Sequence, residues 1–143
     1  MRVASREPWF PGLKMTEKNQ IYKCEICGNI VEVLHVGAGE LVCCGKPMIL
    51  QKENTVDAAT EKHIPILEEI RDNKIKVKIG EIDHPMTEEH NIEWIELVFN
   101  EKIIRKNLKP GEKPEKEFTI RLKPFTPRVY CNLHGLWKSD TIS

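Results

Sequence analysis

The sequence predicts an all-β protein in which a small metal-knuckle module precedes an antiparallel β-sandwich. Two observations support this fold class. After residue 60, short segments of alternating apolar and polar residues recur between turns that contain Pro or Gly, and little of the chain has helical periodicity. Four of the five cysteines lie close together near the N-terminus, as is typical of modules too small to fold without a staple.

Composition divides the chain into three segments. Residues 1–19 are an N-terminal extension with two prolines and few periodic apolar positions. Residues 20–52 hold short β-rich runs around the cysteines and predict the metal module. The polar stretch 51–61 is expected to link this module to the larger domain, residues 53–143.

Four segments of the larger domain are expected to be strands: 75–80, 92–99, 116–122 and 128–131. The segment 92–99 is the most apolar of them, which predicts a central strand. In 116–122 the alternation places Phe118, Ile120 and Leu122 on one face. PILEEI, at 65–70, is expected to form a short helical turn.

The charges balance, with 22 Lys and Arg against 22 Asp and Glu. This balance argues against a nucleic-acid binder or an anionic-membrane binder, because both normally carry a basic excess. No apolar run approaches the roughly 18 residues of a membrane span, and the N-terminus lacks the apolar core of a secretory signal. We therefore expect a cytoplasmic protein, whose thiols stay reduced and whose cysteine clusters bind metal.

Cys24-x-x-Cys27 and Cys43-Cys44 have nearly the spacing of a four-cysteine metal knuckle. Four thiolates suit zinc or a single iron ion, and the alternative is two buried thiol pairs without metal. Adjacent residues of a strand point to opposite faces, so the second pair reaches one ion only if the backbone is distorted there.

A second group contains one thiol and four imidazoles, and its members are spread so widely that only the fold can gather them: His63, His84, His90, Cys131 and His134. Cys131-x-x-His134 is a compact chelating pair followed by Gly135. Taken singly, a histidine is more often a surface or core residue than a ligand. His35, inside the first module, is expected to be a solvated strand residue.

Together the motifs C-x-x-C…CC, TEKH-x-P, HPM, EEH and YCN-x-HG-x-W resemble those of the desulfoferrodoxins, the two-iron class of superoxide reductases. The resemblance covers roughly residues 20–138. It implies a desulforedoxin-like module, with a rubredoxin-like iron on the four clustered cysteines, followed by an immunoglobulin-like sandwich. It also implies a second iron with an axial thiolate and four equatorial imidazoles, supplied by Cys131, His63, His84, His90 and His134.

The activity that this resemblance implies is one-electron reduction of superoxide to hydrogen peroxide at a ferrous centre with an open sixth position. Such an activity defends an anaerobe or microaerophile against oxidative stress. Lys62 matches a lysine beside the open position, and Glu61 matches a glutamate that occupies this position in the oxidised enzyme. The implied electron donor is a rubredoxin-like protein, and the implied assembly is a homodimer. The alternatives are an electron carrier that uses the first iron alone and a zinc-ribbon-type structural protein.

Overall fold

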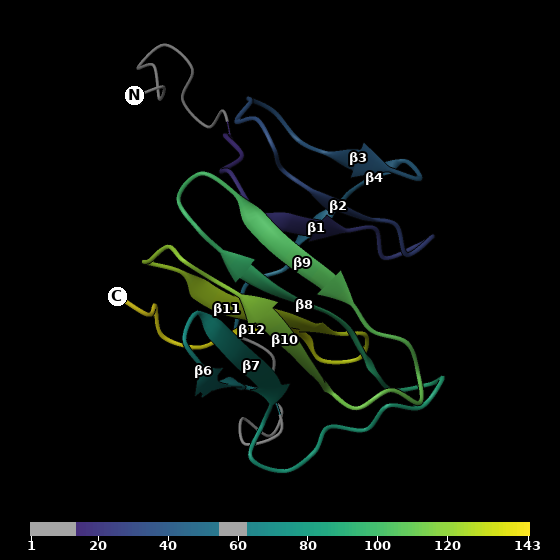
Figure 1. The fold of residues 1–143 in the computed structure, drawn as a ribbon. Helices are drawn as coiled ribbons and strands as arrows, with labels where there is room; N and C mark the ends of the chain where they lie inside the picture. Colours follow the sequence, from purple (N-terminus) through teal and green to yellow (C-terminus); the bar gives the residue numbers. More distant parts are fainter. Residues whose placement is uncertain (1–13, 55–62) are drawn as a thin grey trace. The chain divides into compact units, whose positions relative to one another are not determined.

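The computed structural model describes residues 14–54 and 63–143 (Figure 1). Every helix-or-strand element found in these residues is a β-strand, with no helix among them, so the predicted all-β class is confirmed. The chain forms two compact units, residues 1–52 and 53–143. Across the described ranges, no helix has the length and apolar character that a bilayer crossing demands.

The first unit is built from five very short strands. Its three-stranded sheet has β1 (Ile21–Lys23) in the centre, between β2 (Ile30–Glu32) and β5 (Ile49–Leu50). A separate hairpin pairs β3 (Val42–Cys43) with β4 (Lys46–Pro47). So small a sheet buries few apolar side chains, which leaves the unit dependent on its cysteine cluster for stability.

Residues just before β1 pack against the loop that follows β2. Met15 forms an isolated bridge with Ala38, and the Thr16 amide donates to the Gly37 carbonyl at 2.9 Å. His35 lies in a bend of this loop and is exposed, so it is solvated as expected but does not belong to a strand.

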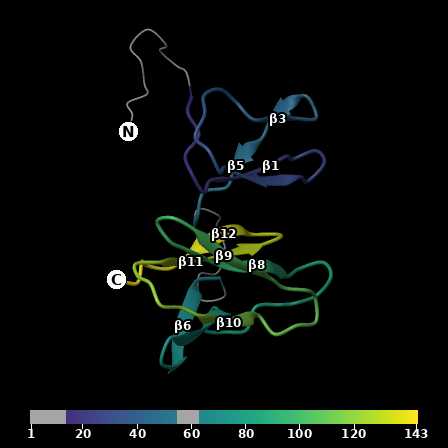
Figure 2. The ribbon, with the colours of Figure 1, turned by 45° about the horizontal axis from the view of Figure 1, so that its top comes forward.

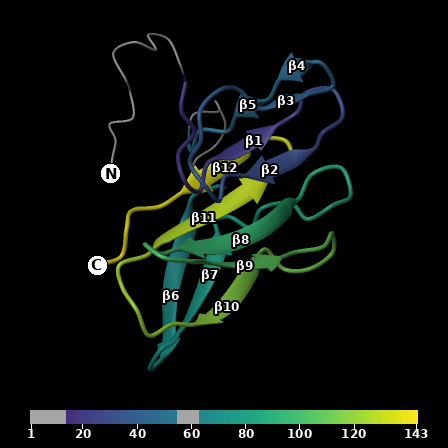
Figure 3. The same ribbon diagram turned by 90° about the horizontal axis from the view of Figure 1, so that it is seen from above.

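The second unit is a sandwich of two antiparallel sheets. One sheet has the order β10-β7-β6, with bounds Glu115–Thr119, Lys74–Ile79 and Pro65–Arg71. The other has the order β12-β11-β8-β9, with bounds Gly135–Lys138, Thr126–Cys131, Ile92–Val98 and Ile103–Asn107. Figure 2 shows the two sheets as separate layers, and Figure 3 shows β11, β8 and β9 side by side. Three strands facing four form an immunoglobulin-like sandwich, as predicted.

Alternating side chains fill the space between the sheets. Ile75, Val77 and Ile79 of β7 point into the core, whereas the lysines between them are partly exposed. β8 pairs with β11 on one side and β9 on the other, which confirms its predicted central place. The expected strand 75–80 forms as β7 up to Ile79, and the expected strand 128–131 forms within β11.

A β-bulge interrupts the pairing of β8 with β11 beside the second cysteine-containing cluster. Tyr130 is opposite Trp94, but Cys131 is opposite Ile92, so Glu93 is an extra residue on β8. The extra residue allows Ile92 and Ile95, three positions apart, both to join the core. Bulges of this kind often re-aim side chains next to functional sites, and this one lies at Cys131.

Three local expectations were wrong or incomplete. Residues 65–70 form most of β6 and no helical turn; β6 is an edge strand with a register shift between Glu69 and Arg71, which disturbs the alternation that identifies a strand. Leu122 is 58% exposed because β10 ends at Thr119. β9 and β12 were not expected, since neither shows a clear period of two.

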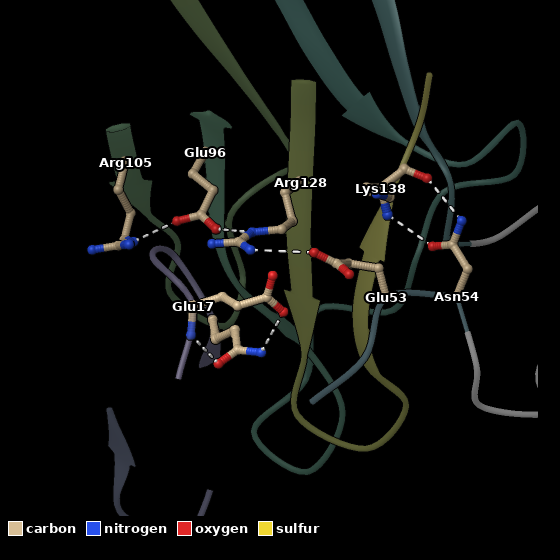
Figure 4. A network of polar contacts seen from close by, with 8 residues as sticks. Glu17, Glu53, Asn54, Glu96, Arg105, Arg128 and Lys138 are labelled. Atoms are coloured by element: carbon tan, nitrogen blue, oxygen red, sulfur yellow. Dashed lines mark hydrogen bonds and ion pairs between the residues drawn. The ribbon is translucent and has the colours of Figure 1, made fainter. Parts of the chain in front are cut away.

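Buried charges connect the start of the second unit to its larger sheet (Figure 4). The Glu96 carboxylate is fully buried and accepts hydrogen bonds from Arg128 and, at 2.8 Å, from Arg105. Arg128 also donates to Glu53 at 3.3 Å. Asn54 continues the attachment, because its side chain bonds both backbone groups of Lys138, at 2.8 and 3.0 Å. Glu53 and Asn54 are thus fixed to β11 and β12.

Candidate metal centres

The first unit brings its four cysteines together at one end of its strands. Their sulfur atoms lie within 4.8 Å of one another, and all four are free thiols: Cys24, Cys27, Cys43 and Cys44. Cys24 and Cys27 lie at the two ends of a turn after β1, and Gly28, the next residue, has a φ of 84°. This positive φ lets the chain turn back so that the Asn29 amide donates to the Cys27 sulfur at 3.4 Å.

The adjacent pair reaches the cluster through the backbone distortion that the sequence predicts. Cys43 pairs with Lys46, so Cys44 and Gly45 form the two-residue loop of the β3–β4 hairpin. Both have positive φ, 54° and 75°, as in the turns that match the twist of a hairpin. Cys44 thereby leaves the strand geometry and directs its sulfur to the same side as Cys43, 3.9 Å away.

The distances between sulfurs fit a tetrahedral ion. Four sulfurs about 2.3 Å from one ion lie about 3.8 Å apart. The Cys27 and Cys43 sulfurs are 3.5 Å apart, and those of Cys43 and Cys44 are 3.9 Å apart. Amide hydrogen bonds lower the pKa of Cys24 to about 6, whereas the neighbouring sulfurs raise the pKa of Cys44 to about 12. The thiols therefore resist becoming thiolates together, and a bound cation removes this conflict.

The second unit gathers the five residues that the sequence scatters. Their ligand atoms all lie within 4.8 Å of one another: His63, His84, His90, Cys131 and His134. His63 lies two residues before the start of β6, and His84 and His90 lie in the connection between β7 and β8. Cys131 ends β11, and His134 lies in the tight loop before β12. The ligands thus come from three places: the segment before β6, the β7–β8 connection and the β11–β12 hairpin.

The four imidazoles form a closed cycle. Ring contacts run from His63 to His84, His90, His134 and back to His63, with centroids 4.6–5.0 Å apart and planes 74–89° apart. Nitrogens about 2.1 Å from one ion are about 3.0 Å apart when cis. The His63 Nε2 atom is 3.1 Å from His134 Nδ1 and 3.2 Å from His84 Nε2. The spacing therefore fits four equatorial ligands, with His63 opposite His90.

Cys131 supplies a fifth donor, 3.8 Å from His134 Nδ1. Burial raises the pKa of its thiol, so an adjacent cation is needed to hold a thiolate there at neutral pH. Burial also lowers the pKa of His84 to about 4, which keeps this imidazole neutral, as a metal ligand must be. His90 and His134 are partly exposed, so solvent reaches the cluster on their side.

Neighbouring groups orient individual rings. The His84 Nδ1–H donates to the Pro85 carbonyl at 2.7 Å, which leaves the Nε2 lone pair for a metal. The Trp137 indole stacks on His63, and its Nε1–H donates to the His134 carbonyl at 3.0 Å. Sequence reasoning assigned no role to Trp137, although its place in YCN-x-HG-x-W was a usable signal.

Glu61 and Lys62, the two predicted site residues outside the two ligand sets, lie outside the described residues. The structure brings together all nine predicted ligands in the two expected sets. It adds Asn91 and Asn132, which join the His90 loop to the Cys131 hairpin through hydrogen bonds.

Family comparisons agree with both sites. The Desulfoferrodoxin family model matches residues 55–140, and the model of the desulfoferrodoxin N-terminal domain matches residues 16–51. A desulfoferrodoxin of Syntrophotalea carbinolica is 61% identical over 126 residues, 88% of this chain and 99% of that protein. A superoxide reductase of Pyrococcus horikoshii is 34% identical and covers 65% of this chain and 96% of its own.

A solved structure has the same architecture. The superoxide reductase of Treponema pallidum aligns over 87% of this chain and 100% of its own, with a TM-score of 0.68 and 30% identity. The fold and the donor sets define an all-β non-haem iron protein with two centres, Fe(Cys)4 and Fe(His)4(Cys). The chain belongs to the desulfoferrodoxin family.

Proposed function

We propose that this chain is a superoxide reductase, which converts superoxide to hydrogen peroxide at the His4Cys centre. The observation that carries the proposal is the closed cycle of four imidazoles with one buried thiol beside it. Relatives and a solved neighbour that carry the name superoxide reductase support it. The proposed ligands are His63, His84, His90, His134 and Cys131 for this centre, and the four clustered cysteines for the other.

The reaction consumes one superoxide, one electron and two protons for each hydrogen peroxide formed. A bound iron ion would supply the electron, and the side chains that would hold it are those of His63, His84, His90, His134 and Cys131. Four neutral imidazoles and one Cys131 thiolate would only partly neutralise a bound divalent ion, so the loaded site would keep a net positive charge. A net positive site favours the approach of an anion. The thiolate also donates electron density to the ion, as thiolates do in haem proteins.

The surroundings of the cluster suit a small anionic substrate. His63, His84 and Cys131 are buried, whereas His90 and His134 are partly exposed and border the route from solvent. We propose that Lys62 attracts superoxide along this route and aids protonation of the product. We propose that Glu61 would supply a carboxylate to the metal in the oxidised protein. Lys62 directly precedes His63 and Glu61 directly precedes Lys62, which supports these roles.

The first centre is proposed to pass electrons or to stabilise its unit. Cys27 and Cys44 are exposed, which is compatible with electron exchange with a rubredoxin-like donor. We further propose that residues 20–52 and 53–143 are the functional domains, that residues 1–19 are an extension, and that the protein is a homodimer.

A stoichiometric measurement tests the proposed activity. The reduced protein is exposed to pulses of superoxide, and hydrogen peroxide and oxygen are both quantified. Reduction gives one hydrogen peroxide per superoxide and no oxygen, whereas dismutation gives one of each per two superoxides. Absence of a fast reaction in the iron-loaded protein contradicts the proposal and favours an electron carrier. A colourless protein that holds two zinc ions also contradicts it, because zinc is redox-inactive.

A further inference from the structure

Two segments that carry ligands of the second centre are joined side by side. One is the loop 87–91, which carries His90. The other is the β11–β12 hairpin, which carries Cys131 at the end of β11 and His134 in its loop. The backbone amide of Asn91 donates to Asn132 Oδ1 at 2.9 Å, and the backbone amide of Asn132 donates to the backbone carbonyl of Asn91 at 3.1 Å. The Asn132 side chain also donates to the Glu89 carbonyl at 3.0 Å.

These bonds lie directly beside ligands. Asn91 follows His90 in the chain, and Asn132 follows Cys131. Fixing the two asparagines against each other therefore fixes the spacing between the backbones that carry an equatorial imidazole and the thiolate. The asparagine side chain combines an acceptor and a donor, and Asn132 uses both to bridge the loops.

The loop 87–91 organises itself through a separate set of bonds. The His90 amide donates to Thr87 Oγ1 at 3.1 Å, and the Thr87 amide donates to the His90 carbonyl at 2.9 Å. The Asn91 side chain donates to the carbonyls of Thr87, at 2.9 Å, and Glu88, at 3.3 Å. These contacts shape the loop but do not connect it to the hairpin.

We propose that Asn132 is a positioning residue that holds the His90 loop against the hairpin and so keeps His90 within reach of the ion. This role explains why an asparagine stands between the ligands in YCN-x-HG-x-W. The proposal rests on the metal site of the proposed function. Retention and spectrum of the metal test it, so its failure is distinguishable from a failure of superoxide reduction.

Asn91 provides a matched control within the same contact. Asn91→Ala and Asn132→Ala each remove an amide side chain that makes two hydrogen bonds to main-chain groups. Asn91 is the more buried of the two, at 8% exposed, so its loss disturbs folding at least as much. However, Asn91→Ala leaves the backbone groups that bond Asn132 in place. A purely structural role for Asn132 predicts similar effects of both changes on the metal.

The experiment uses the full chain loaded with iron at both centres. Release of iron to a ferrous chelator is followed together with the visible thiolate-to-iron absorption and the reduction potential of each centre. Loss of a supporting contact typically lowers metal affinity about 10- to 100-fold, and we expect Asn132→Ala to release iron from the second centre faster by a factor in this range. Its absorption should shift to longer wavelength and its potential should rise, because His90 donates less electron density. The Fe(Cys)4 centre of the same molecules should be unchanged.

Asn132→Asp keeps an acceptor for the Asn91 backbone amide, loses the donor to the Glu89 carbonyl and adds a negative charge. We expect its rate of iron release from the second centre to lie between those of the unmodified chain and Asn132→Ala, which keeps the test decisive if the alanine variant does not fold. The proposal is overturned if Asn132→Ala retains the unmodified spectrum, potential and release rate, or if Asn132→Asp releases the second iron no faster than the unmodified chain. It is also overturned if Asn91→Ala releases the second iron as fast as Asn132→Ala.

Discussion

The indole of Trp137 lies nearly parallel to the imidazole of His63, with ring centroids 4.8 Å apart and planes 20° apart. The same indole donates its N–H to the His134 carbonyl at 3.0 Å. One buried side chain of β12 therefore contacts two neighbouring members of the imidazole cycle. A ligand ring that is supported on its face loses less rotational freedom when it binds a metal, because it is already oriented.

Replacement of Trp137 separates its two contacts. Trp137→Phe keeps an aromatic face for His63 and loses the bond to His134, whereas Trp137→Leu loses both. We expect the Phe variant to retain iron at the second centre and the Leu variant to bind it about tenfold or more weakly. Chelator competition measures the affinity, and urea unfolding of the metal-free variants controls for core packing. Equal iron loss in both variants contradicts a role for the stacking.

Removal of the buried thiolate tests the division into two centres. Cys131→Ser replaces the only sulfur of the second set, so we expect its thiolate-to-iron absorption to disappear while the spectrum of the Fe(Cys)4 centre persists. Visible absorption and iron analysis on the same sample measure both. Cys44→Ser is the reciprocal variant and should affect only the first centre. Simultaneous loss of both spectra in either variant shows that the centres are not independent.

Electrostatic attraction by Lys62 predicts a change in the rate of superoxide capture. We expect Lys62→Ala to slow capture at low ionic strength by about tenfold and to flatten its dependence on salt, without loss of iron. Lys123→Ala is the control, because Lys123 is exposed and precedes β11 at the end away from Cys131. Pulse-generated superoxide at several salt concentrations gives the rates. Equal rates for the Lys62 variant and the unmodified protein remove Lys62 from the mechanism.

The β3–β4 hairpin loop requires a residue that tolerates positive φ at position 45, directly after Cys44. Gly45 has a φ of 75° and open space around its Cα, so Gly45→Ala adds backbone strain without a steric clash. We expect a loss of about 1–2 kcal/mol in the free energy of unfolding of the first unit. Gly37→Ala is the matched control, since Gly37 also has open space and lacks a positive φ. Protection of the Cys43 and Cys44 amides from hydrogen exchange reports the difference, and equal effects of the two changes contradict the argument.

The buried carboxylate of Glu96 is expected to be more important for stability than an exposed one. Glu96→Ala leaves Arg128, only 4% exposed, beside an empty space, and loss of one partner of a buried pair costs about 3–5 kcal/mol. Glu117→Ala breaks the exposed pair with Lys74 and should cost about 1 kcal/mol or less. Urea unfolding of the iron-loaded protein compares the two. A similar small cost for both changes contradicts the importance of the Arg128–Glu96 contact.

The sequence contains enough to predict the ligand sets because ligand chemistry restricts residue types strongly. Cysteine and histidine in a fixed order are rare, so all nine ligands could be named before any distance was known. β7 was also predictable, because Ile75, Val77 and Ile79 alternate with lysines, as expected for a strand with one face in the core and the other toward solvent.

Other features depend on tertiary context and could not be predicted. The edge strand β6 carries a register shift, so PILEEI shows no period of two. The bulge at Glu93 has no local signature, because it is defined only by the pairing of β8 with β11. The bonds of Asn132 and the stacking of Trp137 join residues that are remote in the sequence from their partners, and only the folded chain brings them together.

The two ligand sets differ in when they can become complete as the chain is made. The four thiols lie within one short stretch and are all present once the ribosome has passed Cys44. The imidazole cycle needs His63 and also His134, which lies beyond nearly every strand of the sandwich. Biogenesis of the first centre can therefore begin on a nascent polypeptide, whereas maturation of the second must wait for almost the whole sandwich to be synthesised.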